Sequence, residues 1–283
     1  MLDILKNNKI PLLIFILFVV VPPAVADNTN KVEIEQVAAG HNLAIDIEQI
    51  GFNNKIILSI GDIDDSTLNF KQSGHNQEIS WVSWWGSGKN WGGDIDYDDQ
   101  EIKVWQNCTK SASAGCNKND VGFHISYGTN NTLWWGQGYY FSNRTDTTWT
   151  YDNSEGGGHT ANFDMHGDDN LIKGYQRNCS AGTCDGHTAK IYLYGDDNDV
   201  WATQDTDGAK NLEITVGSVY SEAPGNEVDV EQTGYATHNA VITLTGSQPT
   251  DLWLKQHGNT AQSYSLSQNC VTSGGCSISV TQN

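Results

Sequence analysis

The sequence predicts an all-β fold, a β-solenoid of cross-β character with two strands in each rung. Three observations lead to this prediction: the pattern apolar-x-apolar-x-Gln occurs eleven times, turns rich in glycine, asparagine and aspartate separate the copies, and only Pro224 and Pro249 interrupt the chain after residue 26. Successive side chains of a strand point to opposite faces, so the two apolar residues and the glutamine of each copy share one face. A rung with so few apolar residues cannot fold alone, and rungs must therefore stack to share a core.

The glutamines of the eleven copies are expected to stack into one ladder along the solenoid. A buried amide without a partner costs about 1–3 kcal/mol, whereas amides stacked in cross-β order donate to one another. Most copies are regular, such as Ile45-x-Ile47-x-Gln49, and in the looser copies Gly174 and Ala202 replace the second large apolar residue. The predicted ladder consists of Gln36, Gln49, Gln72, Gln106, Gln137, Gln176, Gln204, Gln232, Gln256, Gln268 and Gln282.

The spacing of these glutamines predicts the rungs. Separations such as the 23 residues between Gln49 and Gln72 fit one strand, an arc, a second strand and a turn. Steps of 12 to 14 residues near both ends of the chain fit half-rungs. We expect one solenoid domain over residues 27–283, with irregular insertions near residues 82–100, 136–160 and 217–226.

The six cysteines fall at one position of the repeat, just after a glutamine. They form three pairs with separations of 8, 5 and 6 residues: Cys108 and Cys116, Cys179 and Cys184, and Cys270 and Cys276. Six cysteines allow 15 pairings, and the short separations favour three local disulfides that clamp the arcs. A metal site is the alternative interpretation, but the eight histidines show no clustering at ligand spacing.

The first 26 residues have the composition of a secretory signal peptide. Lys6 and Lys9 precede an apolar run from Ile10 to Val21, and Ala24-Val25-Ala26 fits a cleavage site. Because a membrane span needs roughly 20 apolar residues, we expect a secreted chain without a membrane anchor. Export would supply the oxidising compartment that disulfides need.

Charge and motif content argue against two function classes. Thirty-four acidic residues against 15 basic ones give a formal net charge of -19, which disfavours nucleic acid as a partner. The sequence contains no Gly-x-Ser-x-Gly, no His-Glu-x-x-His and no phosphate-binding glycine loop. We therefore expect neither enzyme activity nor a cofactor.

The repeat resembles that of the curlin family, the extracellular amyloid fibre subunits of bacterial biofilms. Residues Ser66-Thr67-Leu68-Asn69-Phe70-Lys71-Gln72-Ser73-Gly74-His75-Asn76 follow the family pattern Ser-x-Leu-x-Ile-x-Gln-x-Gly-x-x-Asn with one residue missing from the arc. The resemblance implies a structural subunit or accessory protein of a curli-like extracellular fibre, acting in biofilm matrix formation and cell adhesion. It also implies a head-to-tail homopolymer at the bacterial surface and a partner apparatus for fibre secretion or nucleation.

The aromatic residues support an alternative function, a monomeric secreted adhesin that binds polysaccharide. Rings exposed on the insertions could contact sugars, and the candidates are Trp84, Trp85, Trp91 and Trp134. Two tryptophans have the inward phase of the repeat and are expected in the core, Trp81 and Trp135. Three others have the outward phase and could stack along one face, Trp105, Trp201 and Trp253.

The turns rich in aspartate raise calcium as a ligand. Asp168-Asp169-Asn170, Asp196-Asp197-Asn198-Asp199 and Asp62-Ile63-Asp64 offer oxygen atoms suited to a hard cation. The same residue types are ordinary turn formers, and no copy has the nonapeptide spacing of calcium-binding β-rolls.

Overall fold

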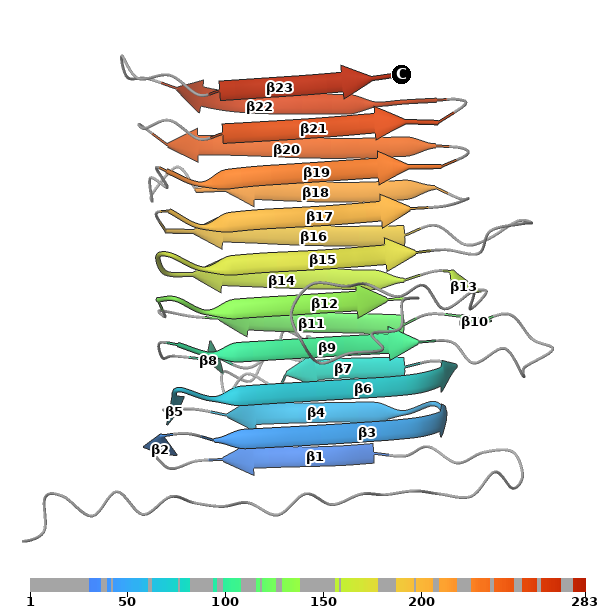
Figure 1. Cartoon of the computed structure of the whole chain (residues 1–283), viewed down its shortest axis with the longest axis vertical. Coiled ribbons are helices and arrows are strands. Elements are labelled where there is room, and N and C mark those ends of the chain that lie inside the picture. The colour runs from blue at the N-terminus through green and yellow to red at the C-terminus, as the bar shows by residue number, and fades with distance from the viewer. Residues whose placement is uncertain are drawn as a thin grey trace, which may run out of the picture.

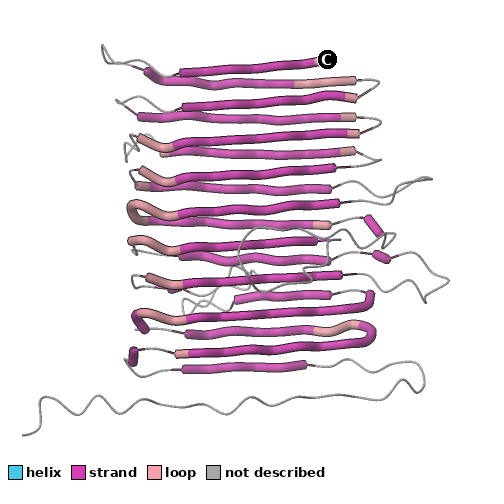
Figure 2. The backbone as a smooth tube through the Cα atoms, in the orientation of Figure 1, coloured by secondary structure: helices cyan, strands magenta, loops and turns pink. Residues whose placement is uncertain are grey.

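The chain folds into two long parallel β-sheets that lie face to face, as the computed structural model shows (Figure 1). The structure describes residues 31–36, 40–41, 43–60, 63–75, 77–81, 94–95, 99–107, 116–117, 119–125, 129–137, 156–157, 159–177, 187–195, 197–205, 209–217, 225–234, 237–246, 251–258, 261–270 and 277–283. These residues form strands and turns, without a helix (Figure 2). The prediction of an all-β solenoid is confirmed, and the two sheets do not close on each other.

Nine strands follow one another in the first sheet, called sheet I here, and all neighbours are parallel. In order they are β1 (Lys31–Gln36), β4 (Lys55–Ile60), β7 (Gln77–Trp81), β11 (Asn119–Ile125), β14 (Thr160–His166), β16 (His187–Tyr194), β18 (Lys210–Val216), β20 (His238–Gly246) and β22 (Tyr264–Cys270).

Nine further strands make up sheet II, again with parallel neighbours throughout. In chain order they are β3 (Ala44–Phe52), β6 (Thr67–His75), β9 (Glu101–Asn107), β12 (Thr132–Gln137), β15 (Leu171–Arg177), β17 (Asp199–Asp205), β19 (Glu227–Thr233), β21 (Asp251–His257) and β23 (Ser277–Gln282).

The chain alternates between the sheets, and this alternation makes the sheets parallel. A sheet II strand leads through an arc into a sheet I strand of opposite direction, and a turn returns the chain to sheet II one rung further along (Figure 1). Every second strand therefore runs in the same direction beside its predecessor, at the spacing of about 4.8 Å that backbone hydrogen bonds set. One arc and its two strands, such as β3 and β4, make one rung.

Five short strands lie beside the stack. β2 (Gly40–His41) pairs with β5 (Ile63–Asp64), β10 (Cys116–Asn117) pairs with β13 (Gly156–Gly157), and β8 (Asp94–Ile95) pairs with β11. Regular structure extends into the ranges predicted as insertions, because Gly136 and Gln137 belong to β12 and Thr160 begins β14.

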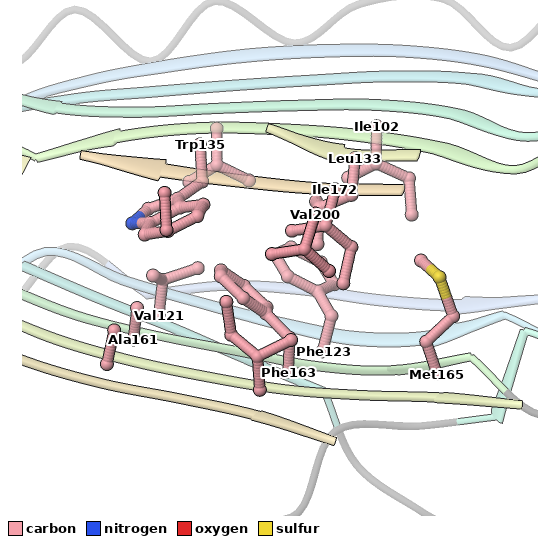
Figure 3. Packing of buried hydrophobic residues seen from close by; sticks show 14 of the residues in the cluster. Ile102, Val121, Phe123, Leu133, Trp135, Ala161, Phe163, Met165, Ile172 and Val200 are labelled. Atoms are coloured by element: carbon pink, nitrogen blue, oxygen red, sulfur yellow. The ribbon is translucent and has the colours of Figure 1, made fainter. Parts of the chain in front are cut away.

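The inward side chains of the two sheets form one continuous hydrophobic core. Burial alternates along each strand, as in β15 and β16, because alternate residues point inward. Figure 3 shows the middle of this core, where Trp135 of sheet II packs edge-on against Phe163 of sheet I with ring centroids 4.9 Å apart. Trp135 is fully buried, as its inward phase predicts.

Candidate functional site

A ladder of glutamine side chains runs along the inner face of sheet II, at the end where each strand enters its arc. From Gln72 onward, each Nε2 donates to the Oε1 of the glutamine one rung closer to the N-terminus, at 2.6 to 3.0 Å. All members are buried apart from Gln282 in the last strand. The members are Gln49, Gln72, Gln106, Gln137, Gln176, Gln204, Gln232, Gln256 and Gln282.

Eight of these glutamines also close their own rungs. Their Nε2 atoms donate to a main-chain carbonyl near the start of the sheet I strand that follows the arc, for example Gln72 to Glu78 O at 3.0 Å. A primary amide has two N–H donors, so one bond can join the rungs while the other holds the arc. A glutamine recurs at this position because it satisfies both requirements inside the core.

Gln36 and Gln268 do not belong to this ladder, which corrects the sequence prediction for these two residues. Their strands lie in sheet I, where Gln36 is in register with Ile60 and Gln268 with Leu244. Each residue stands a half-rung from the next glutamine in the sequence. A half-rung step moves the chain into the opposite sheet, so the spacing that predicted half-rungs also explains the correction.

A second amide ladder, which the sequence analysis missed, lies at the turns on the other side of the stack. The Oδ1 of each asparagine accepts the backbone N–H of the residue one rung before it at 2.8 to 2.9 Å, from Gln100 through Asn131, Asn170 and Asn198 to Asn226. Asn198 Nδ2 in addition donates to Gly167 O at 2.9 Å. The side chains are buried, so this ladder satisfies polar groups that the turns carry into the core.

The residue before each of these buried turn positions has a left-handed backbone. The φ values are 58° at Asp99, 57° at Asn130, 55° at Asp169, 54° at Asp197 and 76° at Gly225. Aspartate, asparagine and glycine are the residues that accept this conformation most readily. The pairing of such a residue with a following asparagine is the signal in the sequence that could have revealed the second ladder.

A file of buried ionisable residues lies at the start of the sheet I strands, next to the arcs. His187, Lys210 and His238 are in register, and all three are fully buried. The His159 ring stacks on that of His187 with centroids 5.3 Å apart. Burial lowers the pKa of His159 to about 4 and holds the pKa of His187 well below 6.5, where His159 and Lys210 lower it further. Both imidazoles are therefore neutral at neutral pH.

The outer face of sheet II carries aromatic side chains on five of its strands, β9, β12, β15, β17 and β21. Trp105, Trp134 and Tyr175 are half-buried, and Trp201 and Trp253 are 42% and 38% exposed. The outward phase predicted for Trp105, Trp201 and Trp253 agrees with their register.

A lysine stands between two of these tryptophans. Lys173 is in register with both Trp134 and Trp201, and its Nζ lies 5.2 Å and 4.2 Å from their ring centroids. Burial lowers the pKa of Lys173, and the faces of the two rings attract its ammonium group. The contact joins three neighbouring strands, β12, β15 and β17, on the outer face of sheet II.

A column of carboxylates runs beside these aromatic residues towards the C-terminal end. Asp199, Glu227 and Asp251 are in register on successive strands. Desolvation raises the pKa of Asp199, Glu227 and Asp229, and neighbouring carboxylates add to the effect. In the part of the chain that the structure describes, no three His, Cys, Asp or Glu side chains come together in a way that could hold a metal ion.

Several predicted residues lie outside the described part of the chain. These are Trp84, Trp85 and Trp91 of the insertions, Asp62 and Asp196 of the turns, and the signal peptide of residues 1–26. The side chains of Trp81, of Gln36 and Gln268, and of the six cysteines Cys108, Cys116, Cys179, Cys184, Cys270 and Cys276 are also outside it. The local disulfide pairing therefore stays a prediction.

The two ends of the stack present strands that have a neighbour on one side only. Within the described residues these are β1 and β3 at the N-terminal end, and β22 and β23 at the C-terminal end. Val280 of β23 is 37% exposed, whereas its register partner Leu254 in the neighbouring strand β21 is fully buried. Among the described residues, the inward apolar side chains and the outer backbone donors and acceptors of these strands thus have no further strand beside them.

Fold and ladders together define a protein of the β-solenoid class. No protein-family model matches the chain, and neither the curated proteins nor the solved structures contain a match. None of the described residues forms a helix long and apolar enough to cross a membrane.

Proposed function

We propose that this protein is a structural subunit or accessory protein of a curli-like extracellular amyloid fibre, acting in biofilm matrix formation and cell adhesion. One observation carries the proposal: the parallel, in-register stacking and the glutamine ladder continue to end strands that each have a single neighbour among the described residues. The same interactions that add one rung to the next can therefore add one chain to the next.

The surface also favours ordered growth at the ends over sideways association. The net charge of -19 makes chains repel one another along their length at low salt. At an end, backbone hydrogen bonds and apolar contacts of a full rung oppose this repulsion. The proposal assigns no catalytic role to any residue.

The resemblance to curlin repeats supports the remaining parts of the proposal. A signal peptide over residues 1–26 would direct the chain out of a bacterial cell, where the three cysteine pairs would oxidise. A secretion or nucleation apparatus would then be the first partner, and a second copy of the chain the lasting one.

The test follows the chain from Asp27 onward after its release from denaturant with the cysteines oxidised. Electron microscopy and fibre diffraction of the same sample over time should reveal unbranched fibres with a meridional reflection at about 4.7–4.8 Å. A β-rich protein that stays monomeric at high concentration over days, with or without added fibre seeds, would overturn the proposal.

A second candidate, a polysaccharide-binding adhesin, rests on the aromatic residues of the outer face of sheet II. Trp201 and Trp253 lie exposed on a flat face, and flat rings stack well on the apolar faces of sugars. Titration with matrix polysaccharides should change the tryptophan fluorescence, and Trp201→Ala should weaken the response. Tyr192→Ala, on the opposite sheet, is the matched control and should leave it unchanged. A flat titration would remove this candidate.

A further inference from the structure

The two sheets are offset by one strand, in opposite senses at the two ends. At the N-terminal end β1 pairs with β4 in sheet I, while β3, the partner of β4 in the first rung, is already the edge of sheet II. At the C-terminal end β23 pairs with β21 in sheet II, while β22 is the edge of sheet I. Figure 1 shows β1 and β23 as the outermost strands of the stack. Each end thus carries half a rung, and the two halves belong to different sheets.

We infer that β23 of one copy and β1 of the next form one shared rung at the junction between chains. In this arrangement β23 continues sheet II by pairing with β3 of the next copy, and β22 continues sheet I by pairing with β1 of that copy. The inference rests on the proposed fibre, and it adds which strands meet and in which register. The partner that fits this surface is a second copy of the same chain.

The residues that would meet match in both sheets. Continuing the register of sheet II places Ile278, Val280 and Gln282 against Ile45, Ile47 and Gln49 of the next copy. Continuing that of sheet I places Tyr264, Leu266 and Gln268 against Val32, Ile34 and Gln36. Every apolar residue meets an apolar residue, and every glutamine meets a glutamine. The four apolar residues at the edges of sheet I are only half-buried in one chain, so stacking would complete their burial.

The junction explains why glutamine occurs at Gln36 and Gln268, the two positions outside the ladder. The pairing of successive strands places Val32 and Tyr264 at the same register position of sheet I. Gln36 and Gln268 each follow four residues later, so they also share one register position, that is, one file across the sheet. Among the described residues between them the file holds Ile60, Ile125, Met165, Leu193, Val216 and Leu244, which are all apolar. In the described part of this file glutamine thus stands on the two end strands, where a neighbouring copy would supply an amide partner.

The file of glutamines also continues across the junction. Within one chain the last ladder bond runs from Gln282 Nε2 to Gln256 Oε1 at 2.6 Å. In the junction Gln49 of the next copy would follow Gln282 of the preceding copy in the same register. The glutamines then stand in one file from chain to chain.

The outward charges select head-to-tail contact over contact between like ends. The edge strands of the N-terminal end carry Glu33, Asp46 and Glu48 against one basic residue, Lys31, and are therefore net acidic. Lys31 pairs with Glu33 at 2.8 Å, and Lys71 of the second rung pairs with Glu48 at 2.6 Å. The outward residues of the C-terminal edge strands are uncharged serines and threonine: Ser265, Ser267, Ser277, Ser279 and Thr281. Two N-terminal ends would bring carboxylates together, whereas unlike ends place carboxylates opposite hydroxyl groups.

The test uses two shortened chains, one starting at Val37 without β1 and one ending at Cys276 without β23. Each chain alone would leave a one-strand gap in one sheet at every junction, so seeded elongation should fall about tenfold or more below that of the chain from Asp27. An equimolar mixture should elongate again, because the two chains fit each other in alternation. The β23 of the chain without β1 meets the β1 of the other chain and completes a rung. At the next junction a complete rung of one chain stacks on a complete rung of the other. Elongation is followed by amyloid-dye fluorescence and electron microscopy.

The outcomes separate this inference from the proposed function. If the chain from Asp27 forms fibres but either shortened chain elongates at the same rate, the shared rung is wrong and the fibre function stands. A mixture as inactive as its components also overturns the shared rung. Absence of fibres from the longer chain overturns both.

A pair of point variants keeps both end strands and tests the register. Gln268→Glu and Gln36→Lys should each slow elongation about tenfold, because each places an unpaired charge in the junction. Combined in one chain, the two changes should restore most of the rate, since the introduced carboxylate and ammonium would lie opposite each other. Additive slowing in the combined variant would contradict the register.

Discussion

The indole ring of Trp135 occupies the space beside Gly174 in the next rung, where a Cβ on the glycine would lie 1.5 Å from Cε3 of the ring. The two residues are in register in sheet II, and Ala202 follows Gly174 in the same file. The largest side chain of this file is thus followed by its two smallest residues. The copies with Gly174 and Ala202 depart from the repeat pattern next to the copy with Trp135, because side chains of neighbouring rungs fill the same part of the core.

Replacing Gly174 should therefore disturb the core. We expect Gly174→Ala to lower the free energy of unfolding by about 1–3 kcal/mol, the usual effect of overpacking. Urea denaturation followed by circular dichroism measures the change. Gly122→Ala is the matched control, because its Cβ would lie 3.6 Å from Asn162 O, an ordinary contact.

A double variant checks that the cause is the contact with Trp135. In the background of Trp135→Leu, the Gly174→Ala change should cost much less than in the parent protein. Equal costs in the two backgrounds would show that the indole ring is not the obstacle.

Removing one amide from the middle of the glutamine ladder should destabilise the fold. Gln176→Ala would leave Gln137 Oε1 and Thr188 O without the donor that they have at 2.8 and 3.0 Å. It would also remove the acceptor of Gln204 Nε2. The expected loss is about 1–3 kcal/mol, measured by urea denaturation. Asn211→Ala removes an exposed amide and should change the free energy by less than about 0.5 kcal/mol.

The aspartate turns should need a left-handed backbone rather than a carboxylate. Asp169 is exposed with φ 55°, so Asp169→Val should cost about 1–2 kcal/mol, while Asp169→Gly and Asp169→Asn should be nearly neutral. Thermal denaturation of the three variants with and without calcium checks this. A loss of calcium-dependent stability in the glycine and asparagine variants would instead favour a cation site at this turn.

Acidification should destabilise the protein through the buried histidines. The pKa of His159 is lowered to about 4 in the fold and is 6.5 when unfolded, so the unfolded chain binds the proton more readily between these values. The stability that the neutral ring contributes is complete above pH 6.5 and falls as the pH drops towards 4, by about 3 kcal/mol. His187, with its pKa also lowered, adds to the loss in the same direction.

The measurement compares urea midpoints at pH 7 and pH 4.5 for the parent and for the double variant His159→Gln and His187→Gln. The loss on acidification should be smaller in the variant. The raised pKa values of Asp199, Glu227 and Asp229 act in the opposite sense, since protonation relieves their repulsion, and they are common to both proteins. An identical pH dependence would contradict the assignment to the histidines.

Local pattern was sufficient to predict the strands and the inward face of the core. Ile45, Ile47 and Gln49 share a face because the side-chain period of a strand is two, and this needs no knowledge of the neighbours. The arcs were predictable for a similar reason, because Gly51 and Asn53 have positive φ and these residue types favour it. The Asp-Asn pairs were the sequence signal of the asparagine ladder. These residue types are common in turns of any kind, so the pairs alone did not predict a ladder.

Membership of a sheet was harder to predict, because identical patterns occur in both sheets. Gln36 and Gln268 have the same local sequence pattern as Gln49 and Gln256, and the number of strands that precede them decides the sheet in which they lie. The file of His159, His187, Lys210 and His238 left no sequence signal. His159 directly precedes β14, the other three residues lie in β16, β18 and β20, and the four segments share no motif.

The strand period, the repeat and the half-rungs at the ends could be read from the chain alone, because these depend on the order of residues along one strand. Stacking of the rungs was needed to show that Trp135 and Gly174 share one space, that nine glutamines form one file, and that β1 and β23 protrude from opposite sheets. The physical reason is that packing volume and hydrogen-bond partners in a solenoid come from the rungs above and below. Those partners are 23 to 39 residues away along the ladder and become neighbours only when the chain has stacked.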